Sequence, residues 1–238
     1  MVDDKGRIPR LWAVVPAAGQ GSRFGAELPK QYSPLAGKTV IEHSLDALLR
    51  CPELAGIVVA LHADDKDFAQ LSCAKHPKVT QVAGGRERAD SVALALASLT
   101  DAEARDWVLV HDAARPCLSE QDLQTLLFKG RSHPVGAILA ARVVDTVKRA
   151  SDEQEAVTTV DRNNLWRALT PQLFRYGALR EALEYCRERA LPVTDEASAM
   201  EHLGGQVLLV EGSHRNIKIT YPDDLTIAEV FLAGALNA

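Results

Sequence analysis

Short apolar runs recur along the first 141 residues and alternate with stretches of helical periodicity. The runs are too short for core helices and end at proline, glycine or charged residues, which is typical of buried strands; they cover 11–15, 56–61, 79–82, 107–110 and 135–141. Apolar residues at helical spacing follow Thr39, a predicted helix cap, and follow Asp90 and Ser91. This alternation predicts an α/β fold with a mainly parallel, twisted, Rossmann-like sheet and helices on both faces.

The second half of the chain departs from this alternation. Within 142–162, β-favouring residues flank an acidic centre at 151–155, which predicts a protruding β-hairpin arm with a solvated tip. Helices are expected at 176–189, at 196–203 and from Asp223 onward, and strands at 207–210 and 217–219. No repeat or linker divides the sequence, so we expect a single domain, residues 1–238, that carries the arm.

Composition and charge narrow the classes of function. With 47% apolar and 25% charged residues among 238, the chain is not expected to be disordered. A net charge of −5 argues against nucleic acid as a partner. No apolar run approaches the ~20 residues of a membrane span, so no membrane partner is expected either. Four widely spaced cysteines without a Cys-x-x-Cys pair favour a reduced, cytoplasmic location.

A glycine-rich segment, 16–25, follows the first predicted strand, at the edge of the sheet where α/β proteins bind ligands. Gly19 and Gly21 allow backbone N–H groups to approach a phosphate chain closely. The segment also carries Arg23 and is followed by Lys30. These two cations are either solvated surface charges or ligands of a triphosphate.

Two familiar phosphate-binding motifs do not fit this segment. Pro29 and Pro34 interrupt the helix that a dinucleotide-binding motif requires directly after its glycines. The tripeptide 37–39, Gly-Lys-Thr, imitates the end of a P-loop, but Tyr32 stands where that motif needs glycine. The sequence therefore predicts a phosphate-binding loop of a different kind.

The glycine segment belongs to a longer pattern of eight motifs that follow one another in order. They are Ala17-Ala18-Gly19-x-Gly21-x-Arg23-x-Gly25 with Pro29-Lys30-Gln31-Tyr32; Gly84-Gly85-x-x-Arg88-x-x-Ser91; His111-Asp112-Ala113-Ala114-Arg115-Pro116; Asp145-Thr146-Val147-Lys148; Asp161-Arg162-x-x-Leu165-Trp166; Thr170-Pro171-Gln172; Thr194-Asp195-Glu196-Ala197-Ser198; and Asn216-Ile217-Lys218. The pattern is similar to that of the sugar-type nucleotidyltransferases. It resembles most specifically the 2-C-methyl-D-erythritol 4-phosphate cytidylyltransferase family.

The resemblance implies a nucleotidyltransferase fold and a CTP-dependent enzyme of isoprenoid precursor synthesis. In the family reaction, the 4-phosphate of methylerythritol attacks the α-phosphate of CTP, releases pyrophosphate and forms 4-diphosphocytidyl-2-C-methyl-D-erythritol. A phosphate monoester has its second pKa near ~6, so this nucleophile needs no general base at neutral pH. Fixed positive charge and Mg²⁺ are the expected means of stabilising the transition state.

The resemblance also implies roles for individual residues. As catalytic residues, Arg23 and Lys30 are expected to contact the CTP phosphates, while Arg162 and Lys218 position the acceptor phosphate. Pocket residues bind the substrates: Thr146, Arg115 and Asp112 on the acceptor side, with Asp112 also approaching the metal, and Ala17, Ala18, Gly19, Gly21, Gly84, Gly85 and Ser91 around the nucleotide. Alternatively, Asp112 caps a turn and the glycines at 84 and 85 only form a turn after a strand. His111 is expected to be a packed neighbour without a catalytic role.

An isolated two-stranded hairpin is marginally stable in water, so the predicted arm needs something to pack against. The resemblance implies a homodimer in which the arms of two subunits pack together and carry Thr146 and Arg162 into the partner's acceptor pocket. The alternative is an arm that folds back on its own sheet. Two other functions stay open: transfer to another polyol phosphate such as ribitol 5-phosphate, and a non-catalytic nucleotide-binding module.

Overall fold

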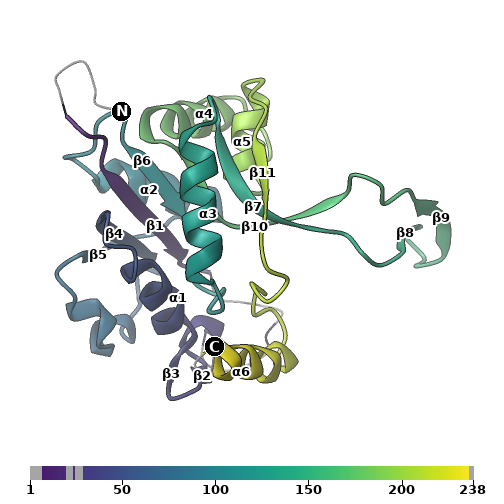
Figure 1. Ribbon diagram of the computed structural model, residues 1–238, viewed down its shortest axis with the longest axis horizontal. Coiled ribbons are helices and arrows are strands. Elements are labelled where there is room, and N and C mark those ends of the chain that lie inside the picture. The colour runs from purple at the N-terminus through teal and green to yellow at the C-terminus, as the bar shows by residue number, and fades with distance from the viewer. Residues whose placement is uncertain (1–6, 20–23, 25–28, 236–238) are drawn as a thin grey trace.

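A seven-stranded sheet forms the centre of the computed structural model, which describes residues 7–19, 24 and 29–235. Its strands are β1 (Leu11–Ala17), β4 (Leu54–Leu61), β5 (Val79–Ala83), β6 (Trp107–Val110), β7 (Gly136–Arg142), β10 (Trp166–Arg175) and β11 (Leu208–Glu211), in the order β11-β7-β10-β6-β1-β4-β5. All run in one direction except β10, which is antiparallel to β6 and β7. The mainly parallel α/β fold predicted from the sequence is confirmed (Figure 1).

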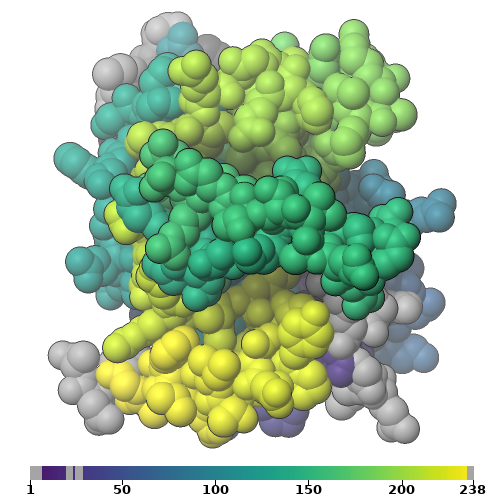
Figure 2. Space-filling model, turned by 90° about the vertical axis from the view of Figure 1, so that its right-hand side faces the viewer, coloured from purple at the N-terminus to yellow at the C-terminus, as the bar shows by residue number. Residues whose placement is uncertain are grey.

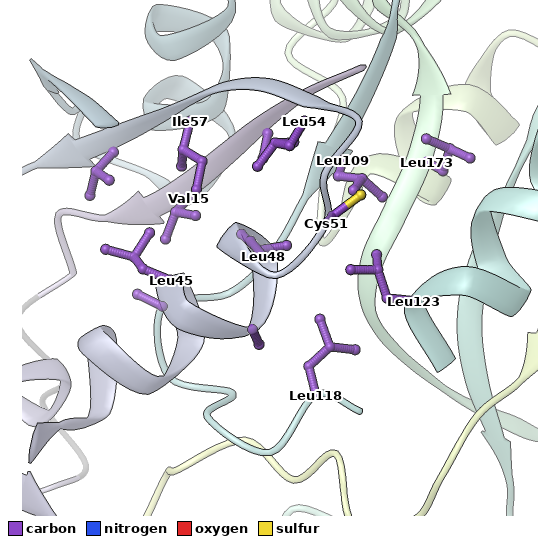
Figure 3. Packing of buried hydrophobic residues seen from close by; sticks show 14 of the residues in the cluster. Val15, Leu45, Leu48, Cys51, Leu54, Ile57, Leu109, Leu118, Leu123 and Leu173 are labelled. Carbon is purple, nitrogen blue, oxygen red and sulfur yellow. The ribbon is translucent and has the colours of Figure 1, made fainter. Parts of the chain in front are cut away.

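Helices cover both faces of this sheet. The helices α1 (Val40–Leu49) and α3 (Glu120–Arg131) pack on one face, and α2 (Arg88–Ser98), α4 (Tyr176–Glu188) and α5 (Glu196–His202) pack on the other. On the first face, Leu45 and Leu48 of α1 lie against Val15 and Ile57 of the sheet (Figure 3). A smaller cluster joins α6 (Asp223–Ala235) to the short strand β2 (Pro34–Leu35) through residues that include Ala228 and Leu35, and β2 pairs with the short strand β3 (Lys38–Thr39).

Capping residues mark the starts of α1 and α2, and the start of α2 differs from the prediction. Thr39 caps α1 as expected: its hydroxyl accepts the Glu42 N–H, and the Glu42 carboxylate accepts the Thr39 N–H at 2.9 Å. The second helix, expected after Ser91, begins earlier, at Arg88, with Glu87 at its cap and Asp90 accepting the Glu87 N–H. This earlier start places Arg88 and Ser91 within the first turns of α2.

The hairpin expected at 142–162 is present and protrudes from the sheet. It continues the β7–β10 ladder through the Val143 N–H, which donates to the Leu165 carbonyl, and ends in the antiparallel strands β8 (Val147–Ala150) and β9 (Ala156–Val160). The arm extends away from the sheet in Figure 1 and towards the viewer in Figure 2. Val144 and Val157 on it are 62% and 64% exposed, so apolar surface is left open on this arm.

Two predictions about strands were incomplete or wrong. The strand β10 was not predicted, because a proline, Pro171, and its polar neighbours Thr170 and Gln172 interrupt the apolar residues. The segment 217–219 is not a strand: Ile219 donates one backbone hydrogen bond to Ala114, but no ladder follows. Within the part of the chain that the structure describes, three short 3₁₀ turns lie at Lys30–Tyr32, Phe68–Gln70 and Cys73–Lys75. Among the helices described, none has the length and apolar character to cross a bilayer.

Candidate active site

A pocket of about 310 Å³ opens at the carboxyl ends of β1, β5 and β6. Its wall includes Ala17, Ala18 and Gly19 after β1, Gly85, Arg88 and Ser91 after β5, and Asp112 after β6; Lys30 and Lys218 complete it from two other segments. Parallel strands end at the same edge of a sheet, which explains why motifs far apart in sequence meet here. Of the predicted nucleotide-side residues, Ala17, Ala18, Gly19, Gly85 and Ser91 therefore line one cavity.

The start of the glycine segment is tied to the turn that carries Lys30. Gln31 is buried, and its side-chain amide donates to the carbonyl of Ala17 at 2.9 Å and to that of Gly19 at 3.3 Å. The neighbouring Lys30 ammonium donates to the Ile219 carbonyl at 2.7 Å. Gln31 stands in the first motif, but the sequence predicts no role for it, because an amide shows no partner until the fold is known.

The first two positions of the turn between β5 and α2, Gly84 and Gly85, pack too closely for a side chain. A Cβ at Gly84 would lie 2.6 Å from the Ala18 Cβ, and one at Gly85 would lie 2.2 Å from the Asp90 Cβ. The Gly84 N–H donates to the Leu61 carbonyl at 2.7 Å, and the Gly85 N–H donates to the Ser91 hydroxyl at 3.1 Å. The two glycines thus bring this turn against the glycine segment, and Ser91 fixes its course.

The Asp112 carboxylate is surrounded by three cations at the wall of the pocket. Its carboxylate lies 3.0 Å from Arg88 Nε, 2.8 Å from Lys218 Nζ and 3.5 Å from Arg115 Nε. Burial alone would raise the pKa of this carboxyl, but the three cations outweigh burial and hold its pKa far below the usual range. Asp112 is therefore a permanent anion and a weak base at neutral pH.

Arg88 connects Asp112 to a second, fully buried carboxylate. Its Nη1 and Nη2 groups donate to Glu196 Oε1 and Oε2 at 2.7 and 3.0 Å, while its Nε group donates to Asp112. Burial opposes the charged form, but the two carboxylates more than offset it and raise the pKa of Arg88. No role was predicted for Arg88 or Glu196, although both stand in quoted motifs.

His111 is enclosed and neutral, as expected for a packed neighbour. Its Nε2 atom lies 3.1 Å from the Arg115 carbonyl, which can only accept, so Nε2 carries the proton. Its Nδ1 atom then accepts from the Thr170 hydroxyl at 3.1 Å, and that hydroxyl accepts the Asp112 N–H at 3.0 Å. Burial lowers the pKa of His111 to about 4. Both ring nitrogens are occupied, which leaves no proton to exchange with a substrate.

The remaining predicted residues lie elsewhere. Arg115 is buried behind the pocket and donates to the Asn216 carbonyl at 2.8 Å, so it supports the wall and does not line it. Thr146 and Arg162 are exposed on the arm, where the Arg162 guanidinium donates to the Val144 carbonyl, and neither lines the pocket of its own chain. Arg23 and Gly21 fall outside the described residues.

This sheet order, with a glycine turn and two lysines gathered at its carboxyl edge, defines a nucleotidyltransferase of the α/β type. Comparison with known proteins makes the assignment more specific. The family model of 2-C-methyl-D-erythritol 4-phosphate cytidylyltransferase (IspD) matches residues 11–234. The chain belongs to this family and is an enzyme of the cytidylyltransferase class.

Individual relatives agree with the family model. A 2-C-methyl-D-erythritol 4-phosphate cytidylyltransferase of Shewanella oneidensis is 53% identical over 223 residues, which are 94% of this chain and 88% of that protein. One of Vibrio cholerae is 51% identical over 94% of this chain and 96% of that protein. Solved structures of the enzyme from Francisella tularensis and from Thermus thermophilus match with TM-scores of 0.82 and 0.79, at 38% and 31% identity; they cover 93% and 94% of this chain and 99% of each matched chain.

Proposed function

We propose that this enzyme transfers a cytidylyl group from CTP to 2-C-methyl-D-erythritol 4-phosphate and releases pyrophosphate. A phosphate oxygen of the acceptor bonds to the α-phosphorus of CTP, while the bond from that phosphorus to the bridging oxygen breaks. The observation that carries the proposal is the pocket itself. The glycine turn, Lys30, Lys218 and Asp112 line one cavity, so the two lysines can meet the phosphates of both substrates there.

The reaction proceeds without a general base from the protein. The acceptor phosphate is already ionised at neutral pH, because its second pKa is near ~6. Asp112 at the pocket wall and His111 directly behind it are also poor bases: Asp112 is held ionised by cations, and His111 has a pKa of about 4 and two occupied nitrogens. Rate enhancement is then assigned to positioning and to positive charge around the reacting phosphates.

The residues divide between the two substrates. Lys30 and Arg23 neutralise the charge that grows on the leaving pyrophosphate. The turn with Gly84, Gly85 and Ser91 forms a small base-binding cleft beside Ala17, Ala18 and Gly19, and Gly21 is assigned to the nucleotide as well. On the acceptor side, Lys218 and Arg162 hold the phosphate, with Thr146 and Asp112 completing that pocket and Arg115 supporting it. Support for this division comes from the segments that carry the two lysines: Lys30 lies beside Gln31, which is bonded to the glycine segment, whereas Lys218 is paired with Asp112.

A divalent cation, Mg²⁺, is proposed to enter with CTP. Among the described residues, no three His, Cys, Asp or Glu side chains gather into a metal cage. Asp112 lies at the wall, but its two oxygens already face Arg88, Lys218 and Arg115, so phosphate and water oxygens would supply most of the ligands of Mg²⁺. The residues present therefore fit an ion held mainly by the triphosphate. When bound, Mg²⁺ would neutralise part of the triphosphate charge.

The domain organisation, oligomeric state and cellular location of the enzyme are also proposals. We assign the chain to a single domain, residues 1–238, that forms a homodimer through its arm, since Val144 and Val157 expose apolar surface there. In the dimer, Thr146 and Arg162 belong to the acceptor pocket of the neighbouring subunit. A cytoplasmic location is supported by the four cysteines, which are all unpaired.

Isotope transfer tests the reaction directly. With CTP labelled at the α-phosphate, the label is expected to appear in the cytidine diphosphate alcohol, and with CTP labelled at the γ-phosphate it is expected in pyrophosphate. UTP and ATP at equal concentration serve as matched nucleotides and are expected to react far more slowly. Appearance of the α-label in inorganic phosphate or CMP, with none in a diphosphate product, would contradict cytidylyl transfer.

A further inference from the structure

Three of the recognised motifs each contain a residue without an assigned contact with substrate, and these three residues meet behind Asp112. Arg88 belongs to the first of them, Glu196 to the second and Thr170 to the third. Arg88 spans the gap between two carboxylates, with Asp112 on its Nε side and Glu196 on its Nη side, at 2.7 to 3.0 Å. Glu196 is completely buried, whereas the Arg88 side chain keeps 26% of its surface exposed at the pocket.

Glu196, one of the two carboxylates that Arg88 contacts, is held in a fixed position. Glu196 is the first residue of α5, whose cap, Asp195, accepts the Ser198 N–H at 2.9 Å. Gln172 of β10 is buried and clamps the same turn, because its amide donates to Asp195 at 2.9 Å and accepts the Ala197 N–H at 2.9 Å. Glu196 therefore has a fixed position, and so does the guanidinium that pairs with it through two hydrogen bonds.

The other carboxylate that Arg88 contacts, Asp112, lies on the acceptor side of the pocket. Asp112 holds the Lys218 ammonium at 2.8 Å, and Lys218 lies on a segment that Arg115 and Asn216 tie to the sheet. Asn216 donates to the Thr170 carbonyl at 2.8 Å, while the Thr170 hydroxyl accepts the Asp112 N–H. The position of Asp112 thus decides where the Lys218 charge stands.

We propose that Arg88 is a positioning residue: held by Glu196, it fixes the Asp112 carboxylate and thereby places Lys218 for the acceptor phosphate. Arg88 donates three of its five N–H groups to two carboxylates, Asp112 and Glu196. Its positive charge is therefore neutralised locally and attracts the triphosphate only weakly. Without Arg88, Asp112 would pair with Lys218 and Arg115 alone, and Glu196 would be a buried anion without a counter-ion. The inference rests on the proposed function for the identity of the acceptor.

Steady-state kinetics on Arg88→Met, Arg88→Lys, Glu196→Gln and the Arg88→Met/Glu196→Gln double variant test this role. For Arg88→Met, the KM for the acceptor is expected to rise about 10-fold or more, and the KM for CTP to stay within about 3-fold. Arg88→Lys is expected to recover part of the loss, because lysine keeps the charge but not the forked geometry. If Glu196 acts through Arg88, adding Glu196→Gln to Arg88→Met changes the acceptor KM less than about 2-fold, although Glu196→Gln alone raises it.

A matched control removes an arginine–glutamate pair that lies away from the pocket. Arg131 pairs with Glu53 at 2.7 Å, and Arg131→Ala is expected to leave both KM values unchanged. A rise in the CTP KM equal to or above that of the acceptor would make Arg88 a nucleotide-binding residue and overturn the proposal. Unchanged KM values in folded Arg88 variants, or additive effects of the two substitutions, would overturn it as well. If Arg88→Met does not fold, Arg88→Lys and Glu196→Gln are compared with wild type under the same criteria.

A crystal structure of Arg88→Lys adds a measurement that does not depend on turnover. The Lys218–Asp112 contact, 2.8 Å here, is expected to shift or break in that variant. An unchanged contact would contradict the positioning role. Wild-type enzyme assayed in parallel keeps the two proposals distinguishable: absence of wild-type turnover with methylerythritol phosphate refutes the proposed function, whereas normal wild-type turnover with unaltered variants refutes only the role of Arg88.

Discussion

Asp112 places a negative charge where the proposed reaction brings two anions together. Its effect is explained by the cations around it: Arg88, Lys218 and Arg115 would repel one another at these distances without a shared carboxylate. The carboxylate thus fixes positive charge in place before substrate binds. Positive charge that is already oriented needs no rearrangement when the transition state forms, which is the main source of electrostatic catalysis.

Substitution of Lys30 tests this explanation on the nucleotide side of the pocket. Its charge is expected to matter more in the transition state than in the ground state, because negative charge on the bridging oxygen grows as pyrophosphate leaves. Lys30→Ala should lower kcat on the order of 10²-fold or more, with a smaller effect on CTP binding. Kinetic measurement separates the two effects. A variant with near-normal kcat and a raised KM for CTP would make Lys30 a binding residue only.

His111 should make stability depend on pH. Its pKa is lowered from 6.5 to about 4 in the folded protein, so the unfolded chain binds the proton first as the pH falls. The stabilisation is fully present above pH 6.5 and is lost as the pH falls from 6.5 towards 4, by about 2 kcal/mol between pH 7 and 5. Urea unfolding of wild type and His111→Asn at both pH values measures this. Equal losses in the two proteins would show that His111 does not carry the effect.

At the scale of elements, the sequence predicted best where a strand is buried on both faces. The strands β1, β4, β6 and β7 stood out because each is a mainly apolar run, whereas the edge strand β5 was predicted although Thr80 and Gln81 at its centre are polar and exposed. The strand β10 was hidden because its first residues leave the core for the arm and its centre is polar. The segment 217–219 looked like a strand, since β-favouring residues do not reveal whether a neighbouring strand is in reach.

In the site, too, features that depend on neighbouring residues could be predicted, whereas contacts between distant residues could not. Motif residues on the pocket wall, such as Gly85 and Asp112, could be predicted because each follows a recognisable strand. The contact of Arg88 with Glu196 joins residues 108 positions apart, and no local pattern indicates which arginine pairs with which carboxylate. The pairing of Arg88 with Glu196 could therefore be identified only from the fold.

Close packing between elements predicts a cost for a methyl group at Gly84. An alanine Cβ there would lie 2.6 Å from the Ala18 Cβ and 2.9 Å from the Ser91 hydroxyl, so the turn must move away from the glycine segment. Gly84→Ala is expected to lower stability by about 1 to 3 kcal/mol, measured by thermal or urea unfolding. Gly234→Ala in α6, where no atom lies within 4 Å, is the control and should leave stability unchanged or slightly higher. Equal stability of the two variants would contradict the close approach.

At the scale of the whole molecule, the protruding arm predicts active sites that are shared between two subunits. Lys30→Ala and Arg162→Ala subunits, each inactive alone, are mixed and allowed to exchange. If Arg162 acts in the partner's site, a mixed dimer has one site with both defects and one intact site, so random pairing should restore roughly a quarter of the sites. If Arg162 acts in its own subunit, every site keeps one defect. No recovery in a mixture that is shown to exchange would reject the shared site.

The most direct test of the account compares acceptors. Pyrophosphate release from CTP and Mg²⁺ is measured with 2-C-methyl-D-erythritol 4-phosphate, with methylerythritol lacking the phosphate, and with ribitol 5-phosphate. The account predicts efficient release with the first acceptor and none with the second, which lacks both the nucleophile and the anionic anchor for Lys218 and Arg162. It predicts a much lower kcat/KM for ribitol 5-phosphate. Equal kcat/KM for the two polyol phosphates, or CTP binding with no pyrophosphate release from any acceptor, would contradict it.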